Sequence, residues 1–60
     1  MVLYVLVFSQ PGGWEIVEKF REMGNTDVVY KAFVLPFSRK ANRVYRVYAD
    51  NSCDILKGNG

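Results

Sequence analysis

The sequence predicts a single small α+β domain in which one helix covers one face of a mostly antiparallel four-stranded sheet. Three observations support this. The chain has 60 residues, 50% of them hydrophobic, which suits one compact core and excludes disorder over most of the length. Short runs of β-branched and aromatic residues alternate with turn residues, as strands do. One run has the spacing of an amphipathic helix. The expected order is β-α-β-β-β.

The first element is predicted to be a central strand. Residues 2–8 are all apolar with no polar alternation, a pattern typical of a strand covered on both faces. Pro11 and the glycine pair after it predict a turn at residues 9–13. The apolar run is much shorter than the roughly 20 residues of a membrane span. It also lacks a basic start and a cleavage site, so we expect no signal peptide and a cytoplasmic location.

Residues 14–23 are predicted to form the helix. At about 100° per residue, one sector is apolar and the opposite sector is acidic. The apolar sector contains Ile16, Val17, Phe20 and Met23, and the acidic sector contains Glu15, Glu18 and Glu22. Gly24 suits a left-handed helix end, and an acidic first turn suits the helix dipole. Trp14 lies just outside the apolar sector, so the sequence leaves open whether it covers the core or is exposed.

Three more strands are predicted in the second half of the chain. Residues 27–37 have strand character, with Pro36 near the end of the run. Residues 43–49 and 53–56 are two further strands, and the polar residues 38–42 and 50–52 are turns. Residues 57–60 are expected to be a loose tail. On this prediction residues 31–46 form a hairpin with a charged tip.

This predicted hairpin is the most polarised part of the chain. It holds five cations and no acid: Lys31, Arg39, Lys40, Arg43 and Arg46. Aromatic residues lie among and beside them: Tyr30, Phe33, Phe37, Tyr45 and Tyr48. Gathering like charges costs repulsion that folding alone does not require, so the segment is predicted to meet a partner, either nucleic acid or an acid-lined protein groove. The plainer alternative is protection of the sheet edge. The net charge of +2 is modest for a nucleic-acid domain.

A single helix is too narrow to cover such a sheet. Four strands span about 19 Å, whereas a helix is about 10–12 Å across. Residues 28–35 also place apolar side chains on both faces of their predicted strand. An exposed apolar sheet face usually marks an interface, so we expect a homodimer or an obligate partner. The alternative is that the aromatic side chains and loops cover the face internally.

The residue types point away from enzymatic chemistry. The chain has no His to activate a nucleophile, and its single Cys can form neither a metal site nor an internal disulfide. The three glutamates fit a solvated face better than an acid–base pair, and Gly12–Gly13 is only a weak phosphate-binding signal. We therefore predict no catalytic residues, no metal and no cofactor. Cys53 is expected to be a buried structural thiol rather than a redox switch.

Several local features together resemble the Dmd family of antitoxins from T4-like phages. They are the chain length, the apolar opening strand with a short helix after it, the segment Asp27-Val28-Val29-Tyr30, Asn42-Arg43 at the start of a strand, the Asp50-Asn51 turn and Cys53-Asp54-Ile55 before a glycine-bearing end. The likeness is spread over most of the chain. It departs from the family's best-known member at Tyr30, where that protein has Trp, and near Leu56, where a second cysteine is missing.

The resemblance implies a function and a set of contacts. It implies a protein that binds an endoribonuclease toxin of the RnlA/LsoA type, fills a groove of that toxin and excludes messenger RNA. By position, Tyr30 would be an inserted anchor and Asn42 a polar contact beside the toxin's active site. Arg39, Lys40 and Arg43 complete the predicted partner-binding set, with the acidic face of residues 15–22 as a possible RNA mimic. The alternative function is a small module that binds RNA or another single strand through residues 31–46.

Overall fold

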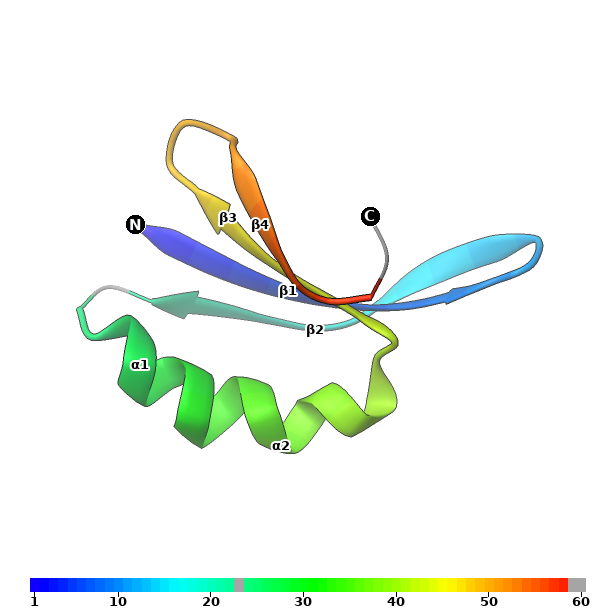
Figure 1. Ribbon diagram of the computed structural model, residues 1–60, viewed down its shortest axis with the longest axis horizontal. Coiled ribbons are helices and arrows are strands. Elements are labelled where there is room, and N and C mark those ends of the chain that lie inside the picture. The colour runs from blue at the N-terminus through cyan, green and yellow to red at the C-terminus, as the bar shows by residue number, and fades with distance from the viewer. Residues whose placement is uncertain (23, 59–60) are drawn as a thin grey trace.

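The computed structural model describes residues 1–22 and 24–58, which form one sheet and one helical segment. The strands are β1 (Val2–Gln10), β2 (Gly13–Glu22), β3 (Arg43–Tyr48) and β4 (Cys53–Lys57). The helical segment consists of α1 (Thr26–Val29), a π-helical stretch (Tyr30–Val34), α2 (Leu35–Phe37) and a 3-10 turn (Ser38–Lys40). All strand pairs are antiparallel, in the order β2-β1-β3-β4. The predicted class, with its four-stranded sheet and its helix on one face, is confirmed (Figure 1).

The order of the elements differs from the predicted β-α-β-β-β. The chain runs β-β-α-β-β, because residues 13–22 form a strand and residues 26–40 form the helical segment. The sequence predicted a helix at residues 14–23 and a strand at residues 27–37, so both predictions were wrong. The strands after residue 42 and the turns at residues 11–12 and 49–52 lie close to where the sequence predicted them.

A β-bulge in β2 explains why this strand has a helix-like sequence. Leu6 pairs with Glu18 and Val7 pairs with Ile16, so Val17 is an extra residue between two regular stretches. The extra residue shifts the alternation of side chains by one position. As a result Val17 and Phe20 pack on the core, whereas Ile16 lies on the opposite face of the sheet. The apolar spacing that resembled a helical sector is therefore two strand patterns joined at a bulge. Met23, the last residue of the expected sector, lies outside the described residues.

The helical segment has start signals that outweigh its β-branched composition. The Asn25 Oδ1 atom accepts hydrogen bonds from the backbone N–H groups of Asp27, at 3.0 Å, and Val28, at 3.4 Å. One turn later, Lys31 forms an ion pair with Asp27 at 3.3 Å, the i, i+4 spacing that supports helices. Val29, Tyr30 and Phe37 then recur at helical spacing and pack towards the sheet.

Pro36 gives a physical reason for the π-helical stretch. In a regular α-helix its ring would collide with the carbonyl of Ala32, and it has no N–H to donate. The helix is instead wider here, and the Leu35 N–H donates to the Tyr30 carbonyl five residues earlier. The helical segment therefore continues past the proline and ends just before the turn into β3, while the β1–β2 hairpin extends beyond it (Figure 1).

The core lies between the helical segment and one face of the sheet. Its buried residues are Tyr4, Leu6, Val34, Ala41 and Val44. The ring of Phe20 on β2 lies 5.7 Å from that of Phe33 and 5.5 Å from that of Phe37, so it joins the helical segment to the edge strand. β1 is central, as predicted, but it is covered on one face only, and the prediction of cover on both faces was wrong.

Two further predictions are corrected by the fold. Residues 31–46 do not form a hairpin, since they run from the helical segment through a turn into β3. The predicted loose tail does not begin at Lys57, because Lys57 belongs to β4 and its ammonium donates to the carbonyls of Ser38 and Ala41. Gly58 has a positive φ of 98° and lies so close to Asn42 that a Cβ would approach the Asn42 carbonyl to 2.9 Å. Residues 59 and 60 lie outside the described part.

Candidate functional site: the open sheet face

The face of the sheet opposite the helical segment is left uncovered by the described part of the chain (Figure 1). We call it the open sheet face. Cross-strand partners share a face, so the pairing of Val5 with Lys19 and Tyr45, and of Val7 with Ile16 and Arg43, identifies its members. They are Leu3, Val5, Val7 and Ser9 of β1, Trp14, Ile16, Lys19 and Arg21 of β2, Arg43, Tyr45 and Val47 of β3, and Cys53 and Ile55 of β4. The sequence predicted an uncovered apolar face, but it assigned that face to residues 28–35.

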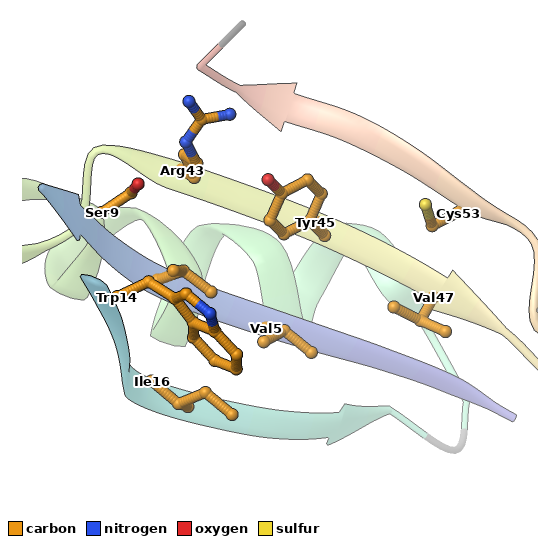
Figure 2. Close-up of a pocket in the computed structure, with 9 residues that line it drawn as sticks. Val5, Ser9, Trp14, Ile16, Arg43, Tyr45, Val47 and Cys53 are labelled. Atoms are coloured by element: carbon orange, nitrogen blue, oxygen red, sulfur yellow. The ribbon is translucent and has the colours of Figure 1, made fainter. Parts of the chain in front are cut away.

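A shallow hollow of about 440 Å³ lies on this face, and its floor is aliphatic. Its lining residues are Val5, Val7, Ser9, Trp14, Ile16, Arg43, Tyr45, Val47 and Cys53. Figure 2 shows these side chains standing on the same side of the sheet, with the helical segment behind it. Trp14 is 69% exposed and Ile16 is 45% exposed. A large ring so exposed beside an apolar floor is typical of a contact surface.

The charges of β2 are separated between the two faces of the sheet. Lys19 and Arg21 are on the open sheet face, opposite Val5 and Leu3. Glu15, Glu18 and Glu22 are opposite Phe8, Leu6 and Val2, on the helix side. Glu22 is buried there and accepts a hydrogen bond from the Gly24 N–H. The three glutamates were predicted to line a solvated helix face. The helix assignment was wrong, and so was the solvation of Glu22, whereas Glu15 is exposed as expected.

The other two strands also place no carboxylate on the open sheet face. Arg43 of β3 lies on the open sheet face, whereas Asp54 of β4 is opposite Arg46 on the helix side and accepts a hydrogen bond from the Tyr48 hydroxyl at 2.5 Å. Among the described strand residues, the open sheet face therefore has three cations, Lys19, Arg21 and Arg43, and no carboxylate. A ligand complementary to this face carries negative charge around an apolar centre.

Two of the five predicted partner-binding residues lie at the hollow. Arg43 lines it directly. Asn42 is exposed beside it, and its amide bonds to the backbone of Ser9: the Asn42 Oδ1 accepts from the Ser9 N–H at 2.8 Å, and its Nδ2 donates to the Ser9 carbonyl at 2.6 Å. Because Ser9 also lines the hollow and pairs with Trp14, this amide fixes one end of the open sheet face.

The other three predicted residues lie away from the hollow. Tyr30 is half-buried on the helical segment, with its ring 6.2 Å from the ring of Tyr4. Arg39 and Lys40 are exposed in the 3-10 turn, where the Lys40 ammonium lies 5.9 Å from the Phe37 ring. The structure therefore does not bring the five residues into one site. Their role as partner contacts stays a prediction.

The sequence analysis missed most of the open sheet face. Trp14, Ile16, Lys19 and Arg21 were assigned to a helix, where they share no face. A usable signal was present, because the two apolar residues are two positions apart with Glu15 between them, and the two cations are two positions apart with Phe20 between them. Cys53 is exposed, so the prediction of a buried thiol was wrong. The question left open for Trp14 is answered by its exposure.

Other candidate chemistry is sparse in residues 1–22 and 24–58. No cluster of three or more His, Cys, Asp or Glu side chains with metal-binding proximity occurs there. No helix in that part has the length and apolarity needed to cross a bilayer. Hydrogen bonds from the Ser52 hydroxyl and backbone hold the pKa of Asp50 below its ordinary value, which stabilises the β3–β4 turn. Comparisons with protein-family models, curated proteins and solved structures gave no match.

Proposed function

We propose that this protein is a small inhibitor that acts by binding another protein and has no catalytic activity of its own. The observation that carries the proposal is the open sheet face. It has an apolar centre, exposed Trp14 and partly buried Tyr45, and cations at its margin. Protein interfaces have this composition, with Trp, Tyr and Arg providing most of the binding energy.

The partner proposed from the resemblance is a bacterial endoribonuclease toxin in the cytoplasm of a phage-infected cell. A rigid domain seated at the mouth of the toxin's RNA groove would exclude the messenger RNA by steric block. In this proposal Trp14 and Arg43 are the main contacts, and Asn42 lies beside them at the end of the same surface. Tyr30, Arg39 and Lys40 would contribute from the helix side only if the partner also reaches around the edge of the sheet.

The test is inhibition of RNA cleavage by purified toxins of the RnlA/LsoA type. The protein should abolish cleavage at equimolar concentration. Trp14→Ala should weaken binding by about 2 kcal/mol, which is roughly 30-fold in Kd. Val28→Ala is the matched control, because Val28 is 55% exposed on the helical segment and away from the open sheet face. Unchanged cleavage by such toxins, or equal inhibition by Trp14→Ala, would contradict the proposal.

A second candidate function is binding of single-stranded RNA. It is favoured by the same three cations together with Trp14 and Tyr45, since bases stack on aromatic rings and phosphates pair with cations. Trp14 is the only tryptophan in the chain, so its fluorescence reports stacking directly. If three phosphates are neutralised, the logarithm of the association constant should fall with the logarithm of salt concentration with a slope of about −2. A salt-sensitive quench of Trp14 by oligouridylate would favour this function over inhibition.

A further inference from the structure

We propose that the open sheet face binds a protein segment with an apolar centre and carboxylates on its flanks. This inference rests on the proposed function, since it specifies which chemistry of the partner the face recognises. It follows from two independent features of the face, the composition of the hollow and the placement of the cations. Figure 2 shows the hollow with Arg43 and Trp14 at one end.

The hollow selects an apolar occupant. Val5, Val7 and Val47 form its floor, and their side chains offer no hydrogen-bonding group to a polar ligand. Trp14 and Ile16 stand at its margin on the edge strand. Covering these side chains removes apolar surface from water, which stabilises the complex in proportion to the area covered. Apolar side chains of a protein segment meet this requirement.

The cations select what flanks that apolar centre. Lys19 and Arg21 lie on edge strand β2, whereas Arg43 lies on β3 at the end of the face that holds Ser9. These positions border the aliphatic floor and leave its middle uncharged. A segment seated on the floor would therefore place its ends beside cations, and carboxylates there would gain charge-assisted hydrogen bonds.

The same features disfavour an RNA strand in this position. Bases seated on the hollow would place their hydrogen-bonding edges against valine side chains, which offer them no partner. The charge pattern also bears on how a ribonuclease would be inhibited. A groove that binds RNA is cationic, and it would repel a face with three cations. The open sheet face therefore docks on an acidic, apolar part of the partner beside the RNA groove, and the rest of the domain covers the groove.

A second copy of this chain is also disfavoured. Two open sheet faces meeting each other would bring together two sets of the same three cations with no strand carboxylate between them. Like charges across an interface cost free energy instead of supplying it. The homodimer expected from the sequence would thus need another surface.

The experiment uses the full chain as bait for a phage-displayed library of random dodecapeptides. Selection should enrich peptides in which two or three apolar residues are flanked by Asp or Glu. Selection with the Trp14→Ala variant as bait should enrich none of these peptides. Lys19→Glu combined with Arg21→Glu should reverse the preference towards basic flanks. Lys31→Glu, a charge reversal at an exposed cation of the helical segment away from the hollow, should keep the acidic preference. Circular dichroism checks that each variant is folded, and the neutral pair Lys19→Gln and Arg21→Gln replaces the reversed pair if that one is not.

Several outcomes would overturn the inference. They are enrichment of no peptides, enrichment without acidic flanks, the same peptides selected by Trp14→Ala, or sub-micromolar quenching of Trp14 by oligouridylate at physiological salt. The last result would assign the face to nucleic acid. The outcome is separable from that of the proposed function. Acidic peptides without inhibition of any toxin would leave the inference standing and reject the inhibitor proposal, and Trp14-dependent inhibition without acidic peptides would do the reverse.

Discussion

Replacing Tyr30 with alanine tests whether this residue stabilises the core or anchors a partner. Tyr30 was predicted to be an anchor, but the structure places it half-buried on the sheet-facing side of the helical segment, 6.2 Å from Tyr4 between ring centroids. Removing a fully buried aromatic side chain costs about 3–5 kcal/mol. Because Tyr30 is only half-buried, we expect Tyr30→Ala to lower the free energy of unfolding by about 2 kcal/mol, including the lost ring contact.

The expected loss can be measured as a shift in melting temperature. For a domain of this size, about 1 kcal/mol corresponds to about 4–8 °C, so Tyr30→Ala should melt about 8–16 °C lower. Trp14→Ala is the comparison, because a 69% exposed side chain contributes little to folding and its loss should cost less than about 0.5 kcal/mol. Thermal unfolding followed by circular dichroism, with urea unfolding as a second method, gives both values.

Two results would refute this reasoning. If Tyr30→Ala melts within about 2 °C of the parent, its ring does not stabilise the core. If Trp14→Ala is the variant that unfolds, the open sheet face is covered in solution. An inhibition assay at a temperature where both variants are folded then tests the anchor. Loss of inhibition by folded Tyr30→Ala would support the predicted partner contact, and full inhibition would reject it.

Four further predictions follow from the packing. Phe20→Ala should cost about 3 kcal/mol in urea unfolding, because its ring meets two rings of the helical segment, and a near-parental midpoint would show that these contacts contribute little. Asn42→Ala should cost about 1–2 kcal/mol and speed hydrogen exchange of the Ser9 amide measured by NMR, while unchanged exchange would contradict the amide bridge. Ser52→Ala should raise the pKa of Asp50 towards its ordinary value in an NMR titration. The ionised Asp50 carboxylate stabilises the fold above its ordinary pKa, and this contribution, which is lost as the pH falls, should be smaller in the variant. An unmoved pKa would assign the shift to another cause. Sedimentation at micromolar concentration should show a monomer, and a dimer in which Trp14 is buried would contradict the charge argument.

The ends of the chain could be predicted from local sequence because local forces determine them. Residues 2–8 are too apolar and β-branched for an edge or a loop, and they form the central strand. Pro11 and Gly12 turn the chain into β2, with Gly12 at a φ of 96° that other residues avoid. The Asp50–Ser52 hydrogen bonds close the second hairpin within three residues.

The middle of the chain was decided by tertiary pairing. The sequence of β2 has the apolar spacing of a helix because the bulge at Val17 shifts the strand alternation. That bulge exists only when β2 is paired with β1. In the opposite sense, residues 26–40 contain enough valine and phenylalanine to read as a strand, yet an Asn25 cap and the need to cover Tyr4 and Leu6 make them helical.

The class of the domain and its excess of cations could be predicted from the amino-acid sequence, as could the fact that one helix cannot cover both faces of a sheet. Which residues stay uncovered depends on how the strands pair. Register places Trp14, Lys19, Arg21 and Arg43 on one face and sends the strand carboxylates to the other. That outcome depends on pairing between strands far apart in the chain, because a shift of one residue would exchange the two faces.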